Sequence, residues 1–345
     1  MSELRLVEWN MEWMNDLFMP GDEGAQFRPD DERPQHGKNS TVRQRRDHLA
    51  GVLNELAPDL AVVVEGPSRQ DELQLFFNAD VTGTWKVVLQ ATPGQSQNIG
   101  IAIRTDAGKF GDPPLKSWDT VKDKRFDPFL QDTDNDDVPE QHRFERRPLY
   151  VEVSPKDGLP FRILGLHLKS KGIFDAIEWS RWWEKAEGNR KKLLAQAGCI
   201  HDKFLEPYLT DAGTKDIPLI VCGDINDGPG MDACEKRLFG SAIESLMGSV
   251  WKPELCLASA LFDSLKPKEK EKLDFSSIYT TSFRDPIFKD VYQREWIDHI
   301  LYSRNAAGKW VKNAKVNQAM PDGNPVWKKY PYASDHFPIS VEVHI

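Results

Sequence analysis

Residues 217–227 read IPLIVCGDIND, a stretch that joins a strand to the polar groups that follow it. The run Ile217–Cys222 is short and apolar, so it predicts a strand that is buried on both faces and breaks at Gly223. Asp224 and Asn226 come directly after that break. Polar side chains just beyond a buried strand lie at the rim of a sheet, where binding and catalytic groups commonly collect.

The same arrangement recurs along the chain, with an acidic, amide or imidazole group at or near the end of a predicted strand. The strands with such groups are predicted at Leu4–Met11 (Asn10), Asp59–Glu65 (Glu65), Phe161–Ser170 (His167), Trp296–Ser303 (Asp298) and Phe337–Ile345 (preceded by Asp335 and His336). Other strands are predicted at Trp85–Thr92, Asn98–Arg104 and Pro148–Ser154. Apolar residues at helical spacing predict helices over residues 42–56 and 179–204.

These polar side chains form a set that is rich in oxygen. Carboxylates and amides suit hard cations such as Mg²⁺ or Mn²⁺, whereas structural zinc sites use Cys and His. The four cysteines have no CxxC spacing. Cys222 lies in an apolar run, where a buried free thiol is expected in preference to a disulfide or a metal ligand. The sequence therefore predicts a Mg²⁺ or Mn²⁺ site at a sheet rim.

Several short motifs resemble those of the endonuclease/exonuclease/phosphatase superfamily, also called deoxyribonuclease-I-like. They are Trp9-Asn10, Glu65, Asn98-Ile-Gly-Ile, His167-Leu-Lys-Ser, Gly223-Asp-Ile-Asn-Asp227, Ile297-Asp-His-Ile and Ser334-Asp-His336. Each motif alone occurs by chance, but here they stand in the family's order over nearly the whole chain.

The resemblance implies a four-layer α/β/β/α sandwich, in which two mainly antiparallel sheets pack face to face between outer helices. We expect a single domain of this type over residues 1–345, with long loops near residues 15–39 and 106–146. The implied activity is the hydrolysis of a phosphate ester by water, assisted by a bound divalent cation.

The resemblance also implies roles for the groups at the metal. Asn10, Glu65 and Asp335 would be ligands, with Glu65 as the principal carboxylate and Asn10 as a neutral oxygen ligand. Asp224 would orient or deprotonate the attacking water, and Asn226 would hold the scissile phosphate through its amide N–H. Asn226 also suits the simpler role of a turn residue after a strand.

Two imidazoles complete the implied site. His336 would polarise water or hold phosphoryl oxygens, with Asp298 behind it to fix its tautomer and favour its protonated form. His167 would give a proton or a hydrogen bond to the phosphate, although it also suits a satisfied core histidine. The division of acid and base roles between these groups stays open.

Softer candidates for contacts with substrate phosphates are Asn98, Arg147, Lys169 and Lys171. Arg147 equally suits a surface ion pair. The helix over residues 179–204 mixes Trp with Lys and Arg, as single-strand binders do, but a Trp stripe at helical spacing is also typical of a core.

An acidic run near residue 134 resembles the opening of a calcium loop, with Asp132, Asp134 and Asp136 at alternate positions. Asp137 and Arg143 replace the Gly and Glu that such a loop requires. We therefore expect a solvated loop there.

The balance of charge limits how a substrate is held. With 45 Lys and Arg against 54 Asp and Glu, the net charge is −9, whereas a protein held to nucleic acid by its overall field is normally basic. Nucleic acid would need a local basic path, for which the candidates are Arg147, Lys169, Lys171 and residues 185–192. We favour DNA or RNA as substrate. The alternatives are a phosphatase or diesterase for a small or lipid-linked phosphate, and a non-catalytic binding module.

Hydropathy bears on location. No run approaches the roughly 18 apolar residues that a membrane span needs, and the first residues lack the basic and apolar segments of a signal peptide. We therefore expect a cytoplasmic protein. Endonuclease, exonuclease or phosphatase action and the oligomeric state stay open.

Overall fold

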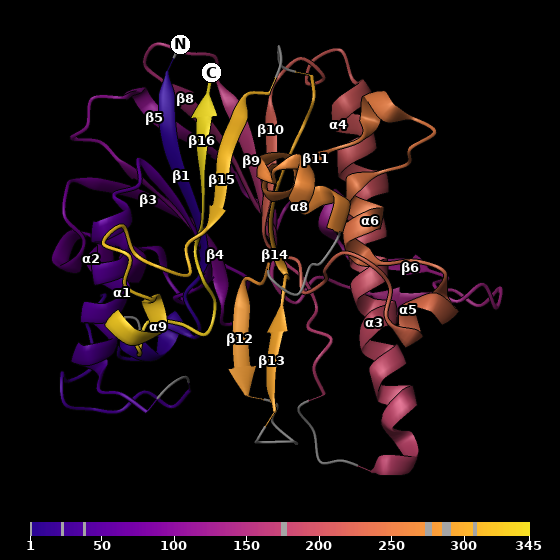
Figure 1. Cartoon of the computed structure of the whole chain (residues 1–345), viewed down its shortest axis with the longest axis horizontal. Coiled ribbons are helices and arrows are strands. Elements are labelled where there is room, and N and C mark those ends of the chain that lie inside the picture. The colour runs from indigo at the N-terminus through magenta and orange to yellow at the C-terminus, as the bar shows by residue number, and fades with distance from the viewer. Residues whose placement is uncertain are drawn as a thin grey trace.

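Two six-stranded sheets form the centre of the computed structural model, which describes residues 2–21, 24–36, 39–173, 178–272, 278–284, 291–305 and 309–345 (Figure 1). The first sheet contains, in spatial order, β15 (Val311–Val316), β16 (Ile339–His344), β1 (Glu3–Asn10), β2 (Leu60–Gly66), β4 (Asn98–Arg104) and β3 (Trp85–Gln90). The second contains β11 (Ala258–Ser259), β14 (Asp298–Tyr302), β10 (Leu219–Asp224), β9 (Phe161–His167), β8 (Leu149–Pro155) and β5 (Phe110–Trp118).

Both sheets share one design, with a parallel pair at the centre and antiparallel neighbours on either side. The parallel pairs are β1 with β2 and β9 with β10, while β16, β4, β14 and β8 run antiparallel to them. Parallel strands end at the same edge of a sheet, and an antiparallel neighbour begins there. The mainly antiparallel sheets expected from the sequence are confirmed.

This topology brings the polar strand ends to one rim. Asp224 at the end of β10 pairs with His167 on one side and with Asp298, the first residue of β14, on the other. In the first sheet Asn10 ends β1 beside β2. Asp335 precedes β16, which runs back from the same rim.

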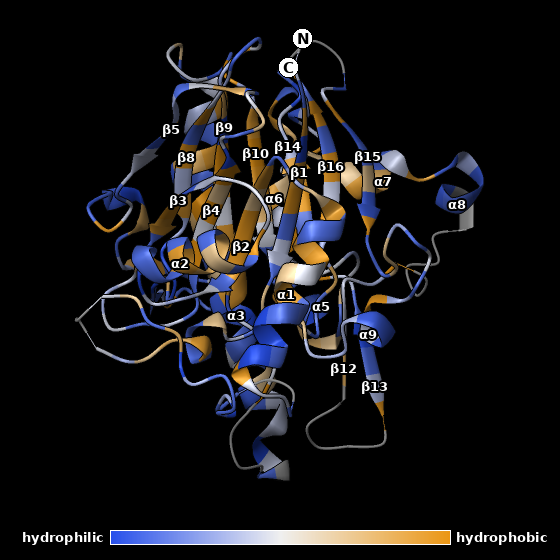
Figure 2. Ribbon diagram, turned by 90° about the vertical axis from the view of Figure 1, so that its left-hand side faces the viewer, coloured by the Kyte–Doolittle hydropathy of each residue, from blue (hydrophilic) through white to orange (hydrophobic). Residues whose placement is uncertain are grey.

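Three apolar layers hold the sandwich together, and they correspond to alternate faces of the strands. Leu4 and Leu6 of β1 face a core between the two sheets, which also contains the free thiol of Cys222. Val7 and Trp9 face α1 (Val42–Leu56) and α2 (Gln70–Asp80). On the other side, the second sheet packs against α3 (Trp182–Ile200) and α6 (Ala242–Met247). The four-layer sandwich is therefore confirmed, and Figure 2 shows apolar colour gathered on its strands.

Shorter helices and two hairpins lie outside the two sheets and the main helices. They are a π-helix (His201–Leu205), α4 (Glu206–Thr210), α5 (Ala233–Leu238), α7 (Ala260–Ser264), α8 (Pro267–Lys272), α9 (Val326–Lys329), and the hairpins β6 (Phe129–Gln131) with β7 (Glu140–His142) and β12 (Thr281–Arg284) with β13 (Tyr292–Glu295). The β12–β13 hairpin and the N-terminal half of α3 extend beyond the sheet rim (Figure 1). Among the described residues, no helix is long and apolar enough to cross a bilayer.

The structure corrects the expectation of one long loop over residues 106–146, because β5 and the β6–β7 hairpin lie within it. β5 contains Pro113 and Pro114, and its register against β8 shifts between Phe110 and Leu115. Prolines are tolerated in an edge strand, where one row of N–H groups is unpaired, but they hide the alternating pattern that marks a strand. The predicted 179–204 helix is also divided, into a 3₁₀ turn, α3 and the π-helix.

Candidate active site

Glu65 carries a carboxylate that the backbone aims at the rim. It has a left-handed conformation with φ 54°, and the pairing of β2 with β4 shifts register at this end of the strand. Such bulges re-aim side chains and are common at active sites. Glu65 Oε2 accepts hydrogen bonds from the backbone N–H of Trp13 at 2.8 Å and from Gln97 Nε2 at 2.7 Å. One oxygen is therefore anchored and Oε1 is directed inward.

Asn10 links carboxylates from the two sheets. Its Nδ2 donates to Glu65 Oε1 at 3.3 Å and to Asp224 Oδ2 at 3.1 Å. Its Oδ1 accepts from the backbone N–H of Glu12 at 2.9 Å. In this arrangement the amide nitrogen faces the carboxylates and the amide oxygen faces the backbone of Glu12, and the expected role of Asn10 as an oxygen ligand stays a prediction. Asn10 thus spaces and orients two acids.

Asp224 is a buried acid whose proton is held unusually tightly. Burial, followed by the negative charge of Asp298, raises the pKa of Asp224 to about 7. Asp224 Oδ1 accepts from the backbone N–H of Asn226, which has φ 56° and whose Nδ2 donates to the carbonyl oxygen of Leu168. Gly223 is required just before, because a Cβ there would collide with the Leu166 carbonyl oxygen. The tight turn places Asp224 and Asn226 side by side at the rim.

His336 and Asp298 form a buried ion pair. His336 Nδ1 lies 2.7 Å from Asp298 Oδ2. Burial opposes charge on the imidazole, but the charge and hydrogen bond of Asp298 outweigh it, and the pKa of His336 is well above its usual range. The ring of Trp9 donates to the His336 carbonyl at 3.0 Å, and Thr280 Oγ1 accepts from the backbone N–H of Asp298 at 3.0 Å. Hydrogen bonds to their backbones therefore hold both His336 and Asp298 in place.

His167 has the opposite protonation preference. Burial, followed by the positive charges of Arg146 and His336, holds the pKa of His167 well below its usual range. Its Nε2 lies 3.9 Å from Glu65 Oε1 and 3.8 Å from Asp224 Oδ2. Pairs of groups whose pKa values are driven apart are typical of acid–base sites. At neutral pH the site holds one charged and one neutral imidazole.

The structure replaces Arg147 by its neighbour as the cation at the site. The Arg146 side chain is partly buried, donates from Nη2 to the Leu168 carbonyl at 2.7 Å and lines the cavity. Arg147 turns away, toward the Phe126 carbonyl and Asp127. The two residues precede β8, and adjacent residues of an extended chain point in opposite directions. The sequence showed two adjacent arginines but not which of them faces inward.

Two of the remaining phosphate candidates have structural partners. Asn98 Nδ2 donates to the Pro67 carbonyl at 3.0 Å, and its Oδ1 accepts from the Thr92 N–H at 2.9 Å. Asn98 is absent from the described cavity lining. Lys171 lines the cavity, but its ammonium group is paired with Asp227 and Glu235. Lys169 also lines the cavity.

A buried arginine that sequence reasoning missed supports the loop after β1. Glu12 and Trp13 both have left-handed backbones, with φ 48° and 52°. Arg45 of α1 is fully buried and donates to the carbonyl oxygens of His36 at 3.2 Å, of Met11 at 3.4 Å and of Glu12. The loop it holds supplies the Trp13 N–H that anchors Glu65. The amphipathic pattern of the helix does not predict the burial of Arg45, because an arginine in such a pattern is normally expected to face solvent.

Glu8 is a second residue that sequence reasoning missed. It is completely buried, and neither carboxylate oxygen has a hydrogen-bond partner within the described part of the chain. Burial, then the charges of Asp298 and Asp224, raises its pKa well above the usual range. Glu8 precedes Asn10 by two positions, so strand alternation placed it on the same face. Its place in β1, close to the charges of Asp298 and Asp224, favours the neutral acid.

A cavity of about 1370 Å³ opens over these residues. At one end its lining contains Glu12, Glu65, His167, Asp224, Asn226, Asp335 and His336. At the other end it contains residues of α3, of the segment 228–235 and of the β12–β13 hairpin. Asp298 is behind His336, outside this lining. The structure therefore brings the predicted carboxylates and imidazoles to one end of a long cavity.

Comparison with known proteins identifies the fold. No protein-family model matches the sequence, and no curated protein matches it. Among solved structures, truncated Caenorhabditis elegans TDP2 superposes with a TM-score of 0.51 at 14% identity, over 99% of this chain and 98% of that chain. An endonuclease/exonuclease/phosphatase family protein from Bacteroides thetaiotaomicron gives 0.50 at 15%, over 99% and 95%. The fold is that of the endonuclease/exonuclease/phosphatase family.

A mannosyl-6-phosphatase from Bacteroides thetaiotaomicron VPI-5482 has the same fold, with a TM-score of 0.52 at 17% identity over 99% of this chain and 100% of that one. These superpositions, at 14–17% identity, show a shared fold. The chemistry of this chain follows from its own site residues.

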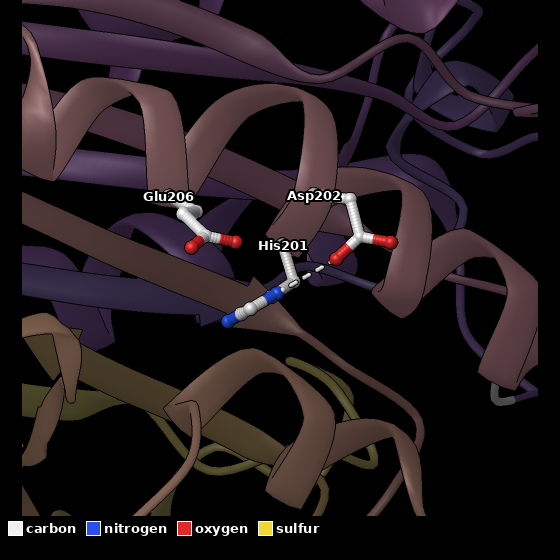
Figure 3. Close-up of side chains that lie close together, drawn as sticks. All are labelled: His201, Asp202 and Glu206. Atoms are coloured by element: carbon white, nitrogen blue, oxygen red, sulfur yellow. Dashed lines mark hydrogen bonds and ion pairs between the residues drawn. The ribbon is translucent and has the colours of Figure 1, made fainter. Parts of the chain in front are cut away.

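A separate group of ligand-type side chains lies away from the rim of this endonuclease/exonuclease/phosphatase fold. His201, Asp202 and Glu206 offer ligand atoms within 4.8 Å of one another. Figure 3 shows His201 joined to Asp202, with the Glu206 carboxylate set apart. Glu206 instead pairs with Lys252 Nζ at 2.7 Å. In the 132–136 loop, Asp132 accepts backbone N–H groups and Asp134 pairs with Lys191.

Proposed function

We propose that the protein is a divalent-metal-dependent phosphodiesterase that acts on nucleic acid. The observation that carries the proposal is the meeting of Glu65 Oε1 and Asp224 Oδ2, from different sheets, within 4 Å of His167 Nε2 and on one amide of Asn10. Two carboxylates converge there at the end of a cavity. Such an arrangement costs free energy, because buried like charges repel. A bound cation would offset that repulsion.

The donor set fits Mg²⁺ or Mn²⁺. Glu65 Oε1 keeps accepting capacity because its hydrogen bond from Asn10 Nδ2 is long at 3.3 Å, and Asp335 faces the same cavity with its side chain 30% exposed. These are oxygen donors of the kind that hard cations select. Glu65 would be the principal ligand and Asp335 a second one. When bound, the cation draws charge from the phosphate oxygens.

The remaining residues supply the proton transfers and hydrogen bonds. Asp224 faces the cavity and would accept a proton from the attacking water as the new P–O bond forms. The ester P–O bond then breaks and its oxygen takes up a proton, which gives a phosphomonoester and an alcohol. His336, held protonated by Asp298, would donate to a phosphoryl or leaving-group oxygen. The second amide hydrogen of Asn226 would hold the phosphate, and Arg146 would add positive charge.

A second candidate function is hydrolysis of a small or lipid-linked phosphate ester. The ion pairs of Lys171 with Asp227 and Glu235, and of Arg190 with Asp232, favour it, because they leave less positive charge for a polyanion. The likeness in fold to a phosphatase is consistent with it. The volume of the cavity, about 1370 Å³, favours nucleic acid, since a small phosphate ester would fill only part of it.

The test is an assay of the purified protein against a labelled single-stranded oligonucleotide, a plasmid, a sugar phosphate and a small diester. We expect cleavage of the oligonucleotide with Mg²⁺ or Mn²⁺ and none in EDTA. Turnover of the sugar phosphate or small diester alone would support the second candidate. Turnover that persists in EDTA, or no turnover with any of these substrates and metals, would overturn the metal-dependent site itself.

A further inference from the structure

The cavity extends far beyond the acids and imidazoles. Its volume of about 1370 Å³ exceeds the range of about 300–1000 Å³ that is typical of small-molecule pockets. Two projecting elements form its outer part, the N-terminal half of α3 on one side and the β12–β13 hairpin on the other (Figure 1). A bound phosphate therefore leaves this outer part for other portions of a substrate.

The outer walls are rich in flat and apolar side chains. Trp182 and Trp183 of α3, with Met231, line one side, and Phe283 and Trp296 line the other. Trp183 is 56% exposed and lines the cavity, so part of its ring is open to a ligand there. The side chain of Trp179, which the sequence pattern also singled out, lies outside the described residues.

Several basic side chains in or beside this region are paired with acids. Lys171 pairs with Asp227 and Glu235. Arg190 Nε donates to Asp232 Oδ2 at 2.6 Å, and its Nη1 donates to the backbone of its own helix. Lys191 pairs with Asp134 and Glu140. Within the expected basic path along residues 185–192, Arg190 and Lys191 are thus paired with acids, which leaves less positive charge along these walls for successive phosphates.

We propose that the Trp182–Trp183 wall is a subsite for an unpaired nucleobase next to the scissile phosphate, an inference that rests on the proposed function. Flat rings stack on aromatic side chains without regard to base identity. Polar groups at the edges, including Gln293 and Arg294, suit the edge atoms of a base better than an aliphatic chain. Bases within a duplex have no open face. The subsite therefore selects single strands or frayed ends.

The opposite wall connects this subsite to the catalytic end. Ser282 N–H and Thr281 Oγ1, both in β12, each donate to the Asp335 carbonyl at 3.0 Å. The hairpin that carries Phe283 is thereby joined to the segment that carries Asp335 and His336. A base held against this wall would fix the neighbouring phosphate relative to His336.

The test is Trp183→Ala, with Trp251→Ala as the matched control because Trp251 is 90% exposed and absent from the cavity lining. Substrates are a short single-stranded oligonucleotide and the same strand with abasic residues flanking the cleaved phosphate. Loss of one stacked base corresponds to about 5- to 150-fold in affinity. We expect KM to rise within that range for the normal strand with little change in kcat. KM for the abasic strand should not change, and Trp183→Phe should restore most of the loss.

The possible outcomes distinguish failure of the base subsite from failure of the proposed nucleic-acid function. Equal effects on both strands, or no effect of Trp183→Ala on a strand that is cut in a Glu65-dependent manner, would overturn the base subsite alone. If neither strand is cut while a small ester is hydrolysed in a Glu65-dependent manner, the nucleic-acid function fails and the subsite fails with it.

Discussion

Two groups of acidic and imidazole side chains in this molecule have nearly the same composition and very different surroundings. Asp224, Asp298 and His336 are buried, and they arrive from separate strand ends and a loop. The group of His201, Asp202 and Glu206 lies on one continuous helical segment at the surface. Both groups bring ligand atoms within 4.8 Å of one another. Residue type and proximity alone therefore do not define a site.

The difference lies in how each charge is compensated. At the surface, Lys252 stabilises the Glu206 carboxylate through a hydrogen bond and lowers its pKa. At the rim, burial raises the pKa of Asp224 to about 7, and Asp298 keeps His336 protonated. Strain and perturbed ionisation are expected where a fold gives up stability for function.

Glu65→Gln should have the largest effect. It removes the ligand charge at nearly constant shape, and metal activation contributes several kcal/mol, so turnover should fall by about 10³-fold or more. His201→Gln, in the surface group, should leave turnover unchanged. Steady-state assays with saturating Mn²⁺ make the comparison. Equal activities for the two variants would show that the rim is no more important than the surface group.

His336→Gln and Asp298→Asn should each reduce kcat by about 10²–10⁴-fold, the usual range for acid–base groups. Because the two side chains act as one unit, the double variant should lose little more than either single variant. A double-mutant cycle measures this directly. Additive losses would mean that Asp298 acts independently of His336.

Arg45→Met should reduce turnover by about tenfold, an estimate for a group that holds a ligand indirectly, as outer-shell partners do. Loss of its bonds to the loop should let the Trp13 N–H move away from Glu65, so the Mn²⁺ concentration for half-maximal activity should rise as well. The control is Arg43→Met on the exposed face of α1, where Arg43 pairs with Asp47. A stability loss with unchanged metal dependence would assign Arg45 to folding alone.

Asp224→Asn should separate stability from activity. The folded-state pKa of about 7 lies above the unfolded value near 3.8, so the folded protein binds more protons between these pH values. The contribution of Asp224 to the free energy of unfolding is full below pH 4 and is lost as pH rises through 7. In EDTA the variant should therefore melt above the wild type at pH 8 but not at pH 4. Calorimetry at both pH values checks this, and a lower melting temperature for the variant at pH 8 would contradict the buried, strained acid.

The strand ends could be predicted because each depends on a local signal. An apolar run that stops at Gly223 indicates both a strand and the position of Asp224, and the order of such runs indicates the fold. What could not be predicted depends on partners distant in the sequence. The sequence near Lys171 does not indicate that it pairs with Asp227 and Glu235. Nor does the sequence near Arg146 indicate that Arg146, and not Arg147, faces the cavity. β12 and β13 are short and lack a clear alternating pattern, so the sequence does not predict the hairpin that walls the cavity.

The most direct measurement is Mn²⁺ binding to the wild type and two variants, followed by electron paramagnetic resonance of the free ion. We expect the wild type to bind Mn²⁺, Glu65→Gln to lose most of that affinity, and Glu206→Gln in the surface group to match the wild type. Unchanged binding by Glu65→Gln, or loss of binding by Glu206→Gln, would place the metal elsewhere and contradict the assignment of the rim as the catalytic centre.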